Sequence, residues 1–103
     1  MLILMFCSGT VTTAVEQEKE PLEAVIKSGR AKAQSCTRCH GRDGMVKFVR
    51  KSGWENSVST FVIKQLLLFR GMRRQHEIMN SVAKPLSDLD IYEIAIWYES
   101  VSN

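Results

Sequence analysis

Residues 36–41 of the chain read Cys36-Thr37-Arg38-Cys39-His40-Gly41. The pattern Cys-x-x-Cys-His is the attachment sequence for c-type haem. Two residues between the cysteines bring both sulfurs near the two vinyl groups along one edge of a porphyrin, where each thiol can form a thioether. The histidine directly after the second cysteine then lies under the iron and offers an imidazole nitrogen as the proximal ligand. The pattern therefore predicts one covalently bound haem c per chain.

Other uses of the same cysteines compete with haem. A structural zinc site needs four ligands, and the set would be Cys36, Cys39, His40 and His76. A thioredoxin-like redox pair would follow a strand of an α/β pattern, and the sequence has no such pattern. A plain disulfide is a further alternative. Haem is favoured because the five-residue pattern rarely arises by chance in 103 residues.

The N-terminus has the pattern of an export signal. The first fifteen residues carry no charged side chain, and their densest apolar run, Leu2 to Cys7, is far shorter than the about 20 residues of a bilayer span. Small residues ending at Ala14 follow, as in a secretory signal, although no basic residue precedes the run. We expect residues 1–14 to be a signal peptide, with a mis-assigned start codon as the alternative. Cleavage would remove Cys7 and send residues 15–103 to the periplasm, where c-type haem is attached.

The chain is small and its charge is uneven. It has 103 residues, 45% of them hydrophobic, and a formal net charge of +3, which indicates one folded domain and not a disordered chain. Between residues 27 and 74 twelve Lys or Arg stand against Asp43 and Glu55. This basic stretch is either solvated surface or a docking face for an acidic partner. Nucleic acid is not expected as a partner, because no aromatic residues interleave with the basic ones.

Hydrophobic periodicity predicts an all-α fold, since strand signals are poor. The first of three main helices carries an apolar face from Leu22 to Ala33, with Pro21 opening its first turn. Gly29 costs this helix about 1 kcal/mol relative to Ala. Another backbone or an aromatic ring is therefore expected to pack closely against it.

The second and third helices have clear ends. The second covers residues 60–70 and is apolar nearly all round, with Ser59 as its cap and Gly71 as its stop. The third starts after Ser87, with Asp90 in the capping-box position. We expect these three helices to be joined by long loops wrapped around the haem.

The two expected loops, residues 41–58 and 71–86, hold the candidates for a second axial ligand, which are Met45, Met72, His76 and Met79. Met79 is favoured because it lies 39 residues after His40, beyond a long buried helix, with room for the chain to cross over the haem. A neutral thioether favours ferrous iron and closes it to substrates. A His40/Met79 pair therefore predicts an electron carrier and not an enzyme.

The sequence resembles class I c-type cytochromes over about residues 22–101. Residues 36–44 are close to the family pattern C-x-x-C-H-G-x-D-G, and residues 61–79 match the spacing of short bacterial members that often form one half of tandem diheme cytochromes. Residues 79–90 also resemble the cytochrome subunit of flavocytochrome c sulfide dehydrogenase.

The resemblance implies that residues 15–103 form a single, small cytochrome c fold with Met79 as the distal ligand. It also implies that the glycine of the first helix crosses an aromatic residue near the C-terminus, here Trp97 or Tyr98. One region departs from the pattern. These families carry a proline whose carbonyl accepts a hydrogen bond from the proximal histidine, and residues 45–60 contain no proline. The partner of the second ring nitrogen of His40 is therefore not assigned.

These observations predict a periplasmic one-electron carrier with haem bound through Cys36 and Cys39 and iron held by His40 and Met79. Its partners would be redox proteins, such as a flavoprotein subunit or a terminal oxidase, and it would not insert stably into a membrane. Two haem alternatives remain besides the zinc-stabilised domain. They are a cytochrome subunit that accepts electrons from a flavoprotein, such as a sulfide dehydrogenase, and an open-site haem protein that binds a small ligand or peroxide. The basic residues expected at the haem rim are Arg38, Lys47, Arg50, Arg73 and Arg74.

Overall fold

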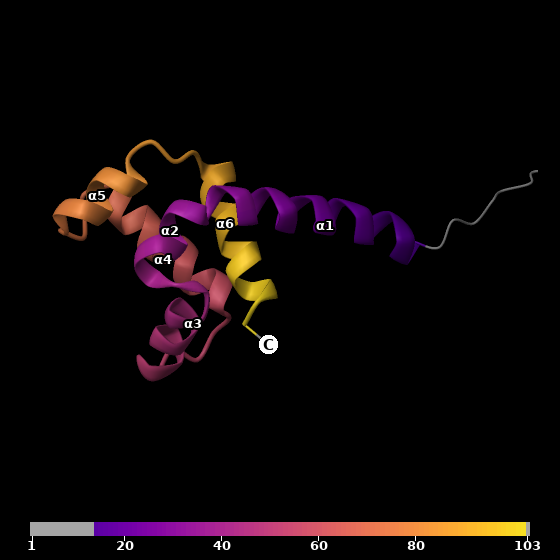
Figure 1. Ribbon diagram of the computed structural model, residues 1–103, viewed down its shortest axis with the longest axis horizontal. Helices are drawn as coiled ribbons and strands as arrows, with labels where there is room; N and C mark the ends of the chain where they lie inside the picture. Colours follow the sequence, from indigo (N-terminus) through magenta and orange to yellow (C-terminus); the bar gives the residue numbers. More distant parts are fainter. Residues whose placement is uncertain (1–13, 103) are drawn as a thin grey trace, which may run out of the picture.

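The computed structural model describes the backbone of residues 14–102 and the side chains of residues 21–41 and 45–102 (Figure 1). This part of the chain contains six helices and no strand, so the predicted all-α class is confirmed. The helices are α1 (Ala14–Lys32), α2 (Gln34–His40), α3 (Arg42–Lys51), α4 (Val58–Arg70), α5 (Glu77–Ala83) and α6 (Asp88–Ser100). None of the described helices is both long enough and apolar enough to cross a bilayer. Residues 1–13, which include Cys7 and all but the last residue of the expected signal peptide, lie outside the described part of the chain.

The three predicted main helices correspond to α1, α4 and α6, with differences at the N-terminal ends of α1 and α4. Helix α1 continues through Pro21, which was expected in its first turn. A proline within a helix removes one N–H donor but has a φ that suits a helix, and the Glu, Gln and Lys residues before it favour helix. The Ser87 and Asp90 side chains form the predicted capping box at the start of α6.

The cap predicted for α4 is wrong by two residues. Ser57 has extended backbone angles, and its hydroxyl accepts a hydrogen bond from the N–H of Thr60 at 3.3 Å. Ser59 lies inside the helix, where its hydroxyl donates to the carboxylate of Glu99 on α6 at 3.2 Å. Ser57 and Ser59 offer the same capping signal in the sequence. The contact of Ser59 with Glu99 on α6 distinguishes them in the structure. Gly71 ends α4 as predicted.

The stretches expected to be loops contain two short helices, α3 and α5. In α3 the side chains of Val46 and Val49, three residues apart, are buried against the rest of the protein. Helix α5 is capped by the His76 ring, whose Nδ1 accepts the N–H of Met79 at 3.2 Å. Histidine is not among the residues that favour this position. Helix α5, with seven residues, is too short to show a clear periodicity, whereas the buried valines of α3 have helical spacing.

Helices α1 and α6 cross in close contact at Gly29 (Figure 1). A Cβ atom on Gly29 would lie 1.9 Å from the carbonyl oxygen of Glu93 and 3.0 Å from the Cβ of Trp97. Only glycine allows the two backbones to approach this closely. The sequence prediction of a nearby backbone and an aromatic residue is thus confirmed, and Trp97 is that residue.

A polar cluster beside this crossing links the two helices. The ammonium of Lys32 on α1 lies 2.8 Å from a carboxylate oxygen of Asp90 on α6 and is also paired with Glu93. The hydroxyl of Ser28 donates to Glu93 at 3.1 Å. The hydrogen bond from Lys32 lowers the pKa of Glu93 and lowers that of Asp90 to about 2. The same two partners raise the pKa of Lys32.

A Gly29→Ala substitution is expected to destabilise the protein by about 1–3 kcal/mol, because the new methyl group would clash with the Glu93 carbonyl. The loss should outweigh the gain in helix propensity. Urea unfolding of the wild type and of Gly29→Ala measures the net change in the free energy of unfolding. Arg30→Ala, at the next and exposed position, is the control and should change stability by less than about 0.5 kcal/mol. Equal effects of the two substitutions would contradict the crossing geometry.

Lys32→Met should lower stability at neutral pH and lose this effect in acid. Carboxylates with a lowered pKa in the folded state stabilise it above their ordinary pKa values and lose that contribution as the pH falls through the lowered values. The difference in unfolding free energy between the wild type and Lys32→Met should therefore shrink between about pH 4 and about pH 2. Urea unfolding across this range tests it, and a difference independent of pH would rule out the ion pairs as its cause.

Candidate haem-binding site

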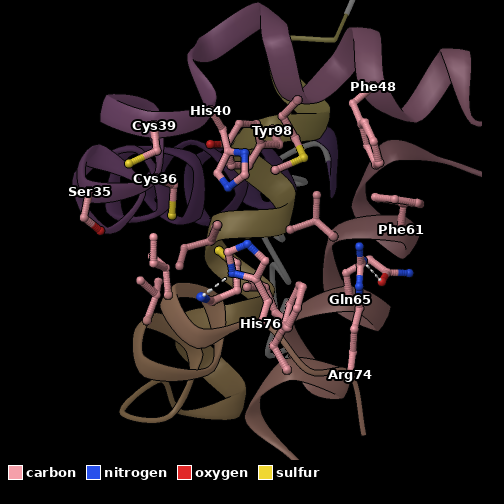
Figure 2. A pocket seen from close by; sticks show the side chains of 18 residues that line it. Ser35, Cys36, Cys39, His40, Phe48, Phe61, Gln65, Arg74, His76 and Tyr98 are labelled. Atoms are coloured by element: carbon pink, nitrogen blue, oxygen red, sulfur yellow. Dashed lines mark hydrogen bonds between the residues drawn. The ribbon is translucent and has the colours of Figure 1, made fainter. Parts of the chain in front are cut away.

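One cavity of about 530 Å³ lies between the haem motif on α2 and the helices α4, α5 and α6 (Figure 2). This volume is within the range of small-molecule and cofactor sites. Most of its lining is apolar. The apolar lining residues are Met45, Phe48, Phe61, Val62, Leu66, Phe69, Ile78, Met79, Val82 and Ile94. The remaining lining residues are Ser35, Cys36, Cys39, His40, Gln65, Arg74, His76 and Tyr98.

Helix α2 presents the motif side chains to this cavity. Cys36, Cys39 and His40 stand at positions i, i+3 and i+4, which share one face of a helix, and all three line the cavity. Neither cysteine is in a disulfide. Burial raises the pKa of the Cys36 thiol, so it is held in its neutral form. The structure thus brings the three predicted attachment residues to one wall.

Gly41 allows the chain to turn immediately after His40. It ends α2 and caps α3 with φ of 68° and ψ of 169°, a backbone conformation that strains any residue with a Cβ atom. The glycine of the Cys-x-x-Cys-His-Gly stretch therefore has a local structural role. It lets α3 start directly after the proximal histidine.

The four candidates for the distal ligand lie at different places in the structure. Figure 2 shows His76 entering the cavity from the side opposite His40, and Met79 also lines the cavity from α5. Met45 lines it from α3, next to the motif. Met72 is 55% exposed and is not part of the lining.

His76 already has a structural role. Its Nδ1 accepts the backbone N–H of Met79 and so caps α5. Met79 itself is partly buried and packs against the core. The histidine therefore orients the turn of helix that carries the methionine.

Asn80 was not identified from the sequence as a site residue, yet it fixes this region. Its Oδ1 accepts the N–H of His76 at 2.8 Å, and its Nδ2 donates to the carbonyls of Phe69 at 2.9 Å and Arg74 at 2.8 Å. These bonds tie the start of α5 to the end of α4. An asparagine next to a candidate ligand carries no special sequence signal, because these bonds depend on how the chain folds back.

Tyr98 on α6 was expected only as a possible helix contact, and it also lines the cavity. Its side chain is 1% exposed, and its hydroxyl has no hydrogen-bond partner among the described residues. Burial raises the pKa of this phenol. A buried hydroxyl without a partner on a cavity wall is expected where a bound group completes the site.

The five expected rim residues differ in their surroundings. Arg74 lines the cavity, where its guanidinium lies 4.7 Å from the centre of the Phe69 ring and donates to Gln65. Arg50 donates to the carbonyl of Ser102, so it is tied to the C-terminal end of the described chain. The side chains of Arg38, Lys47 and Arg73 are exposed and do not line the cavity.

The residues at this site fit a covalently bound haem. Two thiols, an imidazole and a thioether line one largely apolar cavity, and these are the groups that attach and ligate haem c. The zinc alternative finds no support here. Among the described residues no three His, Cys, Asp or Glu side chains form a group that could hold a metal ion.

Comparison with known proteins shows a similarity to a c-type cytochrome. The chain is similar to cytochrome c4 of Thiocapsa roseopersicina, with 33% identity over 75 residues. The match supports a c-type cytochrome. It covers 70% of this chain and 38% of that cytochrome. No family model matches the chain, and no solved structure matches it.

Asn80→Ala is expected to destabilise the protein by about 2 kcal/mol, because it removes three hydrogen bonds between this side chain and the backbone. Ser81→Ala at the next, exposed position removes one hydrogen bond within α5 and should cost less than about 0.5 kcal/mol. Urea unfolding of both variants tests this. An Asn80→Ala variant as stable as the wild type would contradict its role as the link between α4 and α5.

Proposed function

We propose that the chain is a one-electron carrier that holds one haem c through Cys36 and Cys39, with the iron between His40 and Met79. The observation that carries this proposal is that all four side chains line the same apolar cavity. The similarity to a cytochrome c4 supports the same class of protein.

The protein's own residues would bind and tune the haem. A bound haem supplies the reversible one-electron change at its iron. The apolar walls exclude water, and a low-dielectric site disfavours the more highly charged ferric state. The thioether of Met79 is a soft, neutral ligand that favours ferrous iron. With His40 and Met79 as its ligands, a bound haem iron would offer no position to a substrate, and this supports electron transfer as the function.

Two observations favour Met79 over His76 as the distal ligand. The Nδ1 of His76 is occupied by the N–H of Met79, so this histidine serves as a helix cap. Asn80 holds that cap in place. Met79 lies in the first turn of α5, and the cap fixes the backbone of this turn.

We also propose that the protein works in the periplasm and exchanges electrons with other redox proteins. Haem c is attached outside the cytoplasm, and residues 1–14 have the pattern of an export signal. A flavoprotein subunit and a terminal oxidase are the partner classes implied by the sequence resemblance. Among the basic residues expected at the haem rim, Arg38, Lys47 and Arg73 have exposed side chains that are available to an acidic partner.

Met79→Ala should open the iron to small ligands, which tests both the haem site and its ligation. The ferrous variant is expected to bind carbon monoxide readily, whereas the ferrous wild type should bind it poorly because both axial positions are filled. His76→Ala is the matched control and should stay closed, with a loss of about 1 kcal/mol in stability from the missing cap. Optical titration with carbon monoxide gives the result. Opening by His76→Ala and not by Met79→Ala would make His76 the ligand.

A further inference from the structure

The hydroxyl of Tyr98 has no hydrogen-bond partner in the described part of the chain, although the residue is almost completely buried. Proteins rarely bury a hydroxyl without a partner, because the group loses its bonds to water. The side chain could have been a phenylalanine if it served only to pack α6. The oxygen is therefore expected to have a partner once the cavity is filled.

The position of Tyr98 points to the proximal side of the site. Tyr98 on α6 and Cys36 on α2 line the same cavity. His40 stands one helical turn after Cys36, on the same face of α2. Figure 2 places Tyr98 and His40 on the same side of the cavity, away from His76.

His40 in turn needs an acceptor. A histidine that binds iron through one ring nitrogen carries a proton on the other, and this N–H is normally donated to a protein acceptor. The side chain of His40 makes no hydrogen bond to any described residue, and it is exposed on α2. One wall of the cavity therefore combines two groups. The Tyr98 hydroxyl oxygen receives no hydrogen bond, and the second ring nitrogen of an iron-bound His40 needs an acceptor.

We propose that the Tyr98 hydroxyl oxygen accepts a hydrogen bond from the second ring nitrogen of His40 when His40 binds the haem iron. This inference rests on the proposed function. The hydroxyl proton stays free to turn toward the sulfur of Cys36, a weak acceptor. Tyr98 is then a positioning residue, because it fixes the orientation of the imidazole and makes it a stronger donor to iron. A stronger donor favours ferric iron and lowers the reduction potential.

Nuclear magnetic resonance of the ferrous haem-loaded protein tests the bond without any substitution. The second N–H of His40 should give a slowly exchanging signal with nuclear Overhauser contacts to the ring protons of Tyr98. A signal with no such contacts, in a protein with intact haem, would overturn the proposal.

Tyr98→Phe removes the hydroxyl and keeps the ring. The His40 N–H should then exchange about five- to tenfold faster with solvent, and the reduction potential should rise. Tyr92→Phe, on the same helix with a side chain 47% exposed, is the matched control and should change neither quantity. Unchanged exchange and potential in Tyr98→Phe with normal haem content would refute the bond. A wild-type chain that takes up no haem would instead refute the proposed function, and with it this proposal.

Discussion

The close crossing of α1 and α6 at Gly29 is the contact on which the arrangement of the site depends. The backbone of α6 approaches so closely that a methyl group on Gly29 would overlap the Glu93 carbonyl. Because α2 follows α1 after a single residue, this crossing also determines where Cys36 and His40 face α6. Tyr98, five residues after Glu93 on α6, then forms part of the same cavity wall. The helix packing at Gly29 thus positions one wall of the cavity.

The side of the cavity lined by His76 and Met79 is held in place in a different way. It depends on hydrogen bonds that fold the chain after α4 back onto itself, with Asn80 joining the start of α5 to the end of α4. Between the two sides lies a cavity of about 530 Å³. In a small domain, apolar residues around a cavity of this size gain packing contacts when a large apolar group binds between them. On the proposed function the haem supplies those contacts and becomes the centre of the core.

Much of the fold and part of the candidate site could be predicted from local sequence signals. The capping box of α6 and the special role of Gly29 depend on residues close together in sequence or on one residue type, and the structure agrees with both. The side chains of the Cys-x-x-Cys-His motif line one cavity, as their spacing in sequence suggests. Helices α3 and α5 were missed because both are short. Ser57 and Ser59 offer the same capping chemistry, so the choice between them needed the contact with α6. The roles of Asn80 and Tyr98 depend on groups distant in sequence, which one sequence does not identify.

The central claim is that one haem is covalently bound to Cys36 and Cys39. The most direct test is to express the full chain together with the haem-attachment machinery, then measure the mass of the denatured protein and its pyridine haemochrome spectrum. We expect a mass increase of one haem that survives denaturation and a c-type spectrum, both lost in the Cys36→Ala, Cys39→Ala double variant. A wild-type chain without covalent haem, or with a b-type spectrum, would contradict the central claim.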